Sequence, residues 1–196
     1  MKITFFDSQS LSIQLKQGSA VIFPTDTVPA LAALPKYSSL IWKTKKRPLN
    51  KPLILMGSNA DELFEFINPK SLMDAQKMAK NYWPGALTMV MPALGKLIDS
   101  LNPGEKTIGL RVPNCSLSID LLSITGPLAT TSANLSGESP VISIEEASKA
   151  FPKLPLLSNK EWPPASGLAS TVIAWEKKGS WRLLRRGAVM PENLKI

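Results

Sequence analysis

The sequence predicts an α/β fold built on a mixed sheet, and three observations lead to this prediction. Short apolar runs that end at proline or glycine alternate along the chain with segments of helical periodicity. No internal repeat is apparent, so a repeat architecture is not expected. Hydrophobic residues make up 44% of the 196 residues, which suits one compact domain over residues 1–196.

The first half of the chain is expected to place two strands among four helices. A short helix before Gly18, with Ser8 and Ser10 as candidate caps, leads into an apolar run that Pro24 ends. Pro48 must end the next helix, because a proline cannot continue it. The expected elements are a helix at 11–16, a strand at 20–23, a helix at 38–46, a strand at 52–56, and helices at 61–67 and 71–82.

The second half of the chain is expected to supply most of the strands. A turn is predicted at Trp83-Pro84-Gly85, with the tryptophan as an anchor in the core or in the turn. Ser143 and Glu146 have the spacing of a capping box, which predicts a helix ending near Phe151. Residues 152–167 are rich in proline and serine and predict one long loop, which could act as a lid. The other expected elements are strands at 86–91, 107–112, 127–131, 171–175 and 181–184, and a helix at 117–124.

The absence of histidine excludes several kinds of chemistry. The chain cannot contain a Ser-His-Asp triad, a histidine-ligated zinc or an imidazole general base. Its single cysteine, Cys115, leaves no disulfide within the chain, suits a reducing compartment and is expected to be inert. Without a signal-peptide or membrane-spanning pattern, the predicted location is the cytoplasm. An enzyme of this composition must act by placing its substrates and supplying charge.

Positive charge is concentrated in one segment. The net charge of +8 favours an anionic partner such as a nucleotide or RNA, and residues 27–60 contain no acidic residue. One interpretation is a phosphate site, and the other is a solvated helix end whose cations complement the helix dipole. Because Pro48 disfavours helical angles at Arg47, the segment is predicted to be extended, so that Lys45 and Arg47 point to the same side. The cations of this segment are Lys36, Lys43, Lys45, Lys46, Arg47 and Lys51.

Two other features favour ligand binding. Residues 130–137 follow an apolar strand and combine hydroxyl groups, an amide and a glycine, although an ordinary Ser/Asn turn would have the same composition. Arg111 ends an apolar strand and is interpreted either as a snorkelling surface residue or as a clamp for a carboxylate. The same choice applies to Arg185 and Arg186.

Seven motifs in a fixed order resemble those of the YrdC/TsaC family. Each motif alone is weak, but the ordered set between about residues 19 and 187 is specific. The motifs are Pro24-Thr25-Asp26-Thr27-Val28, Lys45-Lys46-Arg47-Pro48 with Lys51-Pro52-Leu53-Ile54, Tyr82-Trp83-Pro84-Gly85-Ala86-Leu87-Thr88, Ile108-Gly109-Leu110-Arg111-Val112-Pro113, Ser132-Ala133-Asn134-Leu135-Ser136-Gly137, Ser170-Thr171-Val172 and Leu184-Arg185.

The resemblance implies a fold and an activity. The implied fold is a twisted mixed sheet with flanking helices around a positively charged concave cavity. The implied activity is that of a nucleotidyltransferase, which joins L-threonine, bicarbonate and ATP into threonylcarbamoyl-AMP and releases pyrophosphate. The product serves the threonylcarbamoyladenosine modification of tRNA, so the implied partners are tRNA or double-stranded RNA and a downstream transferase complex resembling TsaB, TsaD and TsaE.

The resemblance also implies roles for single residues. Those implied to hold the nucleotide and to act in catalysis are Lys45, Arg47, Ser132 and Asn134. Further nucleotide contacts are implied for Lys51, Thr107 and Arg185. The residues implied to hold the threonine are Thr25, Thr27, Arg111 and Ser132. Mg²⁺ is expected with ATP, and no side chain is identified as a metal ligand.

Some positions depart from the family pattern. Pro29-Ala30 replaces Tyr-Gly, which alters the expected threonine pocket, and Met56 stands where some relatives have histidine. Ile142 takes a position that is polar in some relatives. The chain is expected to be the short type without the additional C-terminal domain. Two alternative functions stay open: an RNA-binding module without catalysis, and a carbamoyl-adenylate-forming domain like those of hydrogenase maturation proteins.

Overall fold

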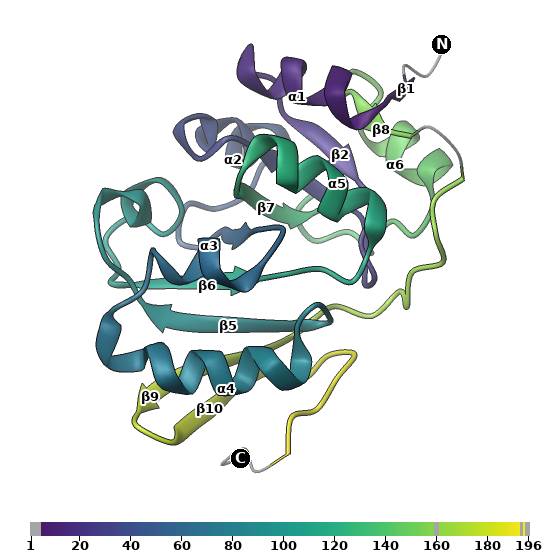
Figure 1. The fold of residues 1–196 in the computed structure, drawn as a ribbon. Helices are drawn as coiled ribbons and strands as arrows, with labels where there is room; N and C mark the ends of the chain where they lie inside the picture. The colour runs from purple at the N-terminus through teal and green to yellow at the C-terminus, as the bar shows by residue number, and fades with distance from the viewer. Residues whose placement is uncertain (1–4, 159–160, 193, 195–196) are drawn as a thin grey trace.

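A computed structural model describes residues 5–158, 161–192 and 194, and its strands form one mixed sheet (Figure 1). The strand order is β1-β8-β2-β3-β7-β4-β6-β5-β9-β10. The bounds are β1 (Phe5–Phe6), β2 (Val21–Phe23), β3 (Ala30–Ala33), β4 (Ile54–Met56), β5 (Leu87–Pro92), β6 (Thr107–Arg111), β7 (Leu128–Ser132), β8 (Leu156–Leu157), β9 (Thr171–Lys177) and β10 (Ser180–Arg185). Strand β4 runs parallel to β6 and antiparallel to β7, so the predicted mixed sheet is confirmed.

Helices cover both faces of this sheet. They are α1 (Ser8–Lys16), α2 (Ser39–Lys45), α3 (Ala60–Phe64), α4 (Leu72–Tyr82), α5 (Ser116–Thr125) and α6 (Ile144–Ala150), with 3₁₀ helices η1 (Pro35–Tyr37), η2 (Pro69–Ser71) and η3 (Lys96–Ser100). Within the residues that the structure describes, no helix is both long and apolar enough to span a membrane.

The two faces of the sheet are covered to different extents. Successive strand side chains alternate between the faces. Leu31, Leu55 and Leu110 pack under α2, α3, α4 and α6 in a core that extends across most of the sheet. On the opposite face, Ala32 and Leu128 belong to a smaller core under α1 and α5, which lie side by side (Figure 1).

The smaller core leaves part of its face uncovered. Among the described residues, its buried strand residues come from the β8-β2-β3-β7-β4 half of the sheet, and none comes from β5, β6, β9 or β10. Thr88 alternates with the core residue Met89, and Arg111 alternates with Leu110, so both side chains point to this second face. Polar side chains therefore gather where α1 and α5 do not cover the sheet.

Three strands were not predicted. Strand β3 lies between β2 and β7 and is fully buried, although alanine has a low strand propensity, because its position inside the sheet outweighs that propensity. Strand β1 pairs with β8, and β8 lies inside residues 152–167, so the prediction of one long loop there was wrong. These two-residue strands pair with distant parts of the chain, which no local pattern shows.

The helix caps agree with the sequence only in part. Helix α1 is capped by Asp7, whose carboxylate accepts from Ser10 N, so Ser8 and Ser10 are not the cap. Ser143 caps α6 as predicted, accepting from Glu146 N at 3.2 Å. The Glu146 carboxylate accepts from Ile142 N instead of Ser143 N, so the reciprocal half of the box lies one residue earlier.

Candidate active site

Lys45 ends helix α2 and is buried with only 2% of its surface exposed. Its Nζ donates to Ser132 O at 2.6 Å, to Ser132 Oγ at 3.1 Å and to Asn134 Oδ1 at 2.8 Å. An ammonium group has three N–H donors, so these contacts use all of them. Lys45 therefore joins the end of α2 to the end of β7.

The charge of Lys45 has no carboxylate partner. The ion pairs among the described residues involve other side chains, and the acceptors around Nζ are neutral oxygens. Burial lowers the pKa of Lys45 to about 8, and the charges of Arg47 and Lys51 add to this lowering. The cluster thus holds an uncompensated positive charge that an anion would stabilise.

The residues after Lys45 do not form the predicted extended segment. Lys45 is helical and Lys46 is left-handed with φ of 51°, so the argument that Lys45 and Arg47 share one side of a strand was wrong. Arg47 instead turns back, donating from Nε to Lys51 O at 3.1 Å and from Nη2 to Pro52 O at 2.9 Å. The two cations nevertheless stay close enough for their charges to interact, and the charge of Arg47 therefore contributes to the lowered pKa of Lys45.

The turn after β7 is held from several sides. Ser132 Oγ donates to Asn134 Oδ1 at 2.6 Å, and Asn134 Nδ2 donates to Glu138 O at 2.7 Å. Ser136 N donates to the carbonyl of Lys45 at 3.2 Å. Both the ammonium and the backbone of Lys45 therefore fix this turn.

A second buried cation lies at the end of β6. Arg111 is 3% exposed, and its guanidinium donates to Asp26 Oδ1 at 2.7 Å, to Thr27 Oγ1 at 2.8 Å and to Gly85 O at 3.0 Å. Burial lowers the pKa of Arg111, and Asp26 opposes this lowering. Three of five N–H donors are used, so two remain for a carboxylate.

The hydroxyl groups beside Arg111 have defined directions. Thr25 Oγ1 donates to Val28 O at 2.7 Å and lies 3.0 Å from Thr27 Oγ1. Because Thr25 has given its only hydrogen to Val28, Thr27 must donate to Thr25 while it accepts from Arg111. A ligand at Thr27 would therefore meet an acceptor and no free donor.

The Lys45 and Arg111 clusters adjoin through the backbone. Ala30 at the start of β3 pairs with Ser132, and Ala133 N donates to Pro29 O at 2.8 Å. Only Val28 and Pro29 thus separate Thr27 from Ala30, the sheet neighbour of Ser132. The altered Pro29-Ala30 pair is part of this junction.

Arg185 brings a third guanidinium close to the others. It donates from Nε and Nη2 to Ser170 O at 3.2 and 2.9 Å. Its charge contributes to the lowered pKa of both Arg47 and Arg111, after burial as the larger cause. Ser170 Oγ in turn lies 2.8 Å from the hydroxyl of Thr88. Arg185 therefore lies near both Arg47 and Arg111.

Two candidates from the sequence are less closely connected. Thr107 begins β6 while Arg111 ends it, and among the described contacts its hydroxyl has no hydrogen bond to the other candidates. Lys51 is exposed and takes part through its carbonyl, which accepts from Arg47 and Trp42, and through its charge. The structure therefore groups Lys51 loosely with Lys45 and leaves Thr107 apart.

The sequence reasoning missed three contributors. Asp26 pairs with Arg111, and Thr88 and Ser170 lie between Arg111 and Arg185, yet none was assigned a role. The available signal for Asp26 was its position: an acidic residue shortly after an apolar strand and before a cation-rich segment. Thr88 and Ser170 could have been associated with each other only if the pairing of β5 with β9 had been known.

Comparisons with known proteins identify the family of the chain. A sequence model of the Sua5/YciO/YrdC family, described as telomere recombination, matches residues 14–187. The threonylcarbamoyl-AMP synthase of Mus musculus is 29% identical over 192 residues, covering 93% of this chain and 68% of the mouse protein. That of Pseudoalteromonas translucida is 35% identical over 142 residues, covering 70% and 76% of the two chains. The names of these relatives indicate an enzyme.

A solved structure shows the same fold. The crystal structure of P. abyssi Sua5 complexed with L-threonine has a TM-score of 0.83 and 26% identity, over 94% of this chain and 57% of the archaeal chain. The present chain thus spans a little over half of that protein. With a family match over most of its length, the chain belongs to the Sua5/YciO/YrdC family.

Proposed function

We propose that the chain is a threonylcarbamoyl-AMP synthase, a nucleotidyltransferase that uses L-threonine, bicarbonate and ATP. One observation supports this most directly. Burial and the charge of Arg47 lower the pKa of Lys45, and burial and the charge of Arg185 lower those of Arg47 and Arg111. Among the residues that the structure describes, Arg111 alone of these four cations forms a salt bridge, with Asp26. Such an excess of positive charge suits a triphosphate.

The cations take different parts in binding the nucleotide. Arg47 and Arg185 keep N–H donors that the described contacts do not use, so we assign them the direct contacts to phosphate. Lys45 has its three donors engaged, so it supplies charge and holds Ser132 and Asn134 for the nucleotide. Lys51 and Thr107 are secondary candidates for nucleotide contacts.

Threonine is assigned to the Arg111 cluster. The two remaining N–H donors of Arg111 bind the substrate carboxylate, and the buried Thr25–Thr27 pair lines the same place. Ser132 adjoins through β3 and contacts the amino acid from the nucleotide side. The relative crystallised with L-threonine supports an amino-acid site in this fold.

The reaction requires aligned substrates and positive charge near the phosphates, and it requires no side-chain nucleophile. An oxygen of the threonine-derived carbamate attacks the α-phosphorus, and the bond from that phosphorus to the pyrophosphate oxygen breaks. Negative charge spreads over the phosphates as pyrophosphate departs, and the convergent cations stabilise it. A chain without histidine can catalyse this step.

Magnesium is proposed to arrive with ATP. No group of three or more His, Cys, Asp or Glu side chains within the described ranges is arranged to hold a metal ion. The oxygen-rich surroundings of Ser132 and Asn134 fit an ion that is bound mainly by phosphate oxygens and water. Mg²⁺ would neutralise part of the triphosphate charge there.

The decisive experiment measures pyrophosphate release with all three substrates and magnesium. Wild-type protein is expected to release pyrophosphate only when threonine and bicarbonate are both present, and Arg47→Ala is expected to abolish release while leaving weak RNA binding intact. No release by the wild type would contradict the proposal and favour the RNA-binding module. Release with carbamoyl phosphate in place of threonine and bicarbonate would favour the carbamoyl-adenylate alternative.

The proposal extends to the cellular setting. We propose that residues 1–196 act as one domain, in the cytoplasm, and that the product passes to a transferase complex that modifies tRNA. These statements stay predictions, and a lid role could involve only the part of residues 152–167 outside strand β8, which pairs with β1 and β2.

A further inference from the structure

The hydroxyl group of Thr171, at the start of β9, fastens the chain that follows β10. Thr171 Oγ1 accepts from Gly187 N at 3.0 Å and donates its hydrogen to Val189 O. The side chain of Thr171 is fully buried. Because a hydroxyl group has only one hydrogen to donate, none is left for a ligand. These contacts indicate that Thr171 holds the chain and does not bind a substrate.

Residues 187–189 lie too close to the start of β9 for a side chain at Gly187. A Cβ atom there would overlap the carbonyl oxygen of Ala169 and the backbone of Ser170. Ala188 N donates to Ala169 O at 2.9 Å. The two backbones are therefore in direct contact, with hydrogen bonds on both sides of Ser170.

Ser170 also holds the guanidinium of Arg185. The hydrogen bonds that the structure describes for this guanidinium all go to Ser170, to its carbonyl oxygen and, at 3.3 Å, to its Oγ. Arg185 is exposed, so packing does not fix its long side chain. Arg185 is thus held twice, by its own contacts with Ser170 and by the backbone contacts of Gly187 two residues later.

We propose that Thr171 is a positioning residue for Arg185, and that it acts through residues 187–189. This inference rests on the proposed function, in which Arg185 contacts a phosphate of ATP. Loss of the Thr171 hydroxyl removes two hydrogen bonds to the segment that directly follows Arg185. The guanidinium is then less well ordered before ATP arrives, so more conformational freedom is lost when it binds phosphate.

The test is calorimetric titration of the full chain with ATP and magnesium. Thr171→Val keeps the shape of the side chain without its hydroxyl group, and we expect the Kd for ATP to rise about tenfold. Thr171→Ser keeps the hydroxyl group and should restore the affinity of the wild type. Gly187→Ala leaves the hydroxyl group in place but forces the two backbones apart, so it should weaken binding as Thr171→Val does.

Thr125→Val is the matched control for the loss of a hydroxyl group. Thr125 Oγ1 donates to Gly126 O at 2.8 Å, where it holds the backbone at the end of α5. This variant should leave the Kd for ATP unchanged. Equal weakening by Thr125→Val and Thr171→Val would overturn the proposal, because general destabilisation would then explain the loss.

A double-mutant cycle tests whether Thr171 acts through Arg185. Arg185→Met should weaken ATP binding at least as much as Thr171→Val does. The double variant should then bind ATP no more weakly than Arg185→Met alone, because the residue that Thr171 positions is already gone. Additive losses would contradict the proposal, since Thr171 would affect ATP binding without Arg185.

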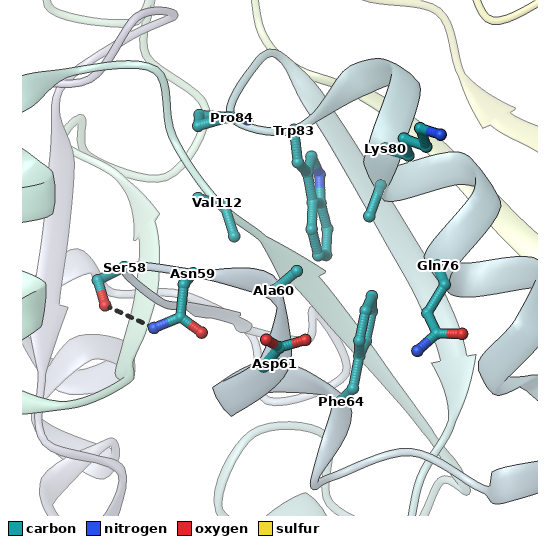
Figure 2. A pocket seen from close by; sticks show the side chains of 11 residues that line it. Ser58, Asn59, Ala60, Asp61, Phe64, Gln76, Lys80, Trp83, Pro84 and Val112 are labelled. Carbon is teal, nitrogen blue, oxygen red and sulfur yellow. Dashed lines mark hydrogen bonds between the residues drawn. The ribbon is translucent and has the colours of Figure 1, made fainter.

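Lys80→Met is the control for the loss of one positive charge. Figure 2 shows Lys80 on α4, beside the pocket between α3 and α4, with its ammonium directed away from that pocket. Helix α4 packs on the larger core, on the face of the sheet opposite the Arg111 side chain. Lys80→Met should leave the Kd for ATP unchanged. A loss equal to that of Arg185→Met would show that net charge controls binding, and the proposal would fail.

The titration distinguishes failure of this inference from failure of the proposed function. If the wild type binds ATP and Thr171→Val binds it equally well, the positioning role is wrong and the synthase proposal stands. If the wild type does not bind ATP, the proposed function is wrong and this inference fails with it.

Discussion

The two buried cations of the site, Arg111 and Lys45, differ in how their charges are compensated. Arg111 has a carboxylate partner, Asp26, at 2.7 Å, and two further oxygens complete its contacts. Lys45 is as deeply buried but has only neutral oxygens of Ser132 and Asn134 around its ammonium. The first cluster is close to neutral, whereas the second keeps a net positive charge.

This difference supports the proposal that the two clusters bind different substrates. A compensated arginine with two free N–H donors orients a small carboxylate without needing a change in local charge. An uncompensated lysine, with Arg47 beside it, is most stable when an anion with several charges is bound. The comparison therefore favours the proposed roles, with Arg111 orienting threonine and Lys45 supplying charge for the triphosphate.

The largest effect is expected from Arg111→Met. This change leaves the partly buried Asp26 carboxylate without its guanidinium, with Asn114 N as its remaining donor, and we expect the free energy of unfolding to fall by about 3 kcal/mol. Threonine binding should be lost because the carboxylate loses its guanidinium. Urea unfolding and calorimetric titration with threonine measure the two effects.

The chain offers a matched control for this variant. Arg182 pairs with Glu176 at 3.0 Å, but these side chains are 64% and 44% exposed. Arg182→Met should change the free energy of unfolding by less than about 0.5 kcal/mol. Equal destabilisation by the two variants would show that burial of the Arg111 pair is not the cause.

The second effect is expected from Lys45→Met, which should impair activity far more than folding. Ser132 and Asn134 lose a donor, but the cost of burying a charge without a carboxylate disappears as well. We expect a change in the free energy of unfolding below about 1 kcal/mol and a fall in pyrophosphate release of about 100-fold or more. Destabilisation as large as that of Arg111→Met would contradict the comparison.

The third effect is a pH dependence in which stability and substrate binding move in opposite directions. Lys45 has a pKa of about 8 in the folded chain against an ordinary value of 10.5. Between these values the unfolded chain binds more protons than the folded chain, so the contribution of Lys45 to the free energy of unfolding rises with pH. Over the same interval Lys45 loses its charge, and the KM for ATP should rise about tenfold.

Urea unfolding and steady-state kinetics from about pH 7 to about pH 9.5 measure both trends. The stability of Lys45→Met serves as the reference, because this variant lacks the titrating group while retaining the others. A KM for ATP that stays constant over this interval would show that the charge of Lys45 does not contribute to ATP binding.

The fold could be predicted where local chemistry decides it. An apolar run ended by Pro24 gave β2, the apolar run that begins at Pro52 gave β4, and a serine with the correct spacing gave α6. Strand β3, of sequence Ala-Leu-Ala-Ala, could not be found this way, since its neighbours in the sheet and not its propensity make it a strand. Strand β8 depends on pairing with β1, about 150 residues away in the sequence.

In the site, too, local sequence did not indicate the contacts between residues that are distant in the chain. Lys45 and Asn134 meet although 89 positions separate them, and only the resemblance to a known family indicated that they belong together. The local argument about Lys45 and Arg47 failed, because helix α2 continues to Lys45 and Lys46 then takes left-handed angles. Asp26 was missed because it lies in the loop after β2, whereas its partner Arg111 ends β6, 85 positions away.

The smallest effect is expected from Lys51→Met. Lys51 is exposed, and its charge is the last of the three causes that lower the pKa of Lys45. Its removal should move the alkaline rise in the KM for ATP upward by less than about half a pH unit. High salt should reproduce this shift in the wild type by screening the exposed charge, but should have little effect on the Lys51→Met profile. A change of tenfold or more in the KM at neutral pH would instead show that Lys51 binds phosphate directly, and would move it from the surroundings of the Lys45 cluster into the nucleotide site.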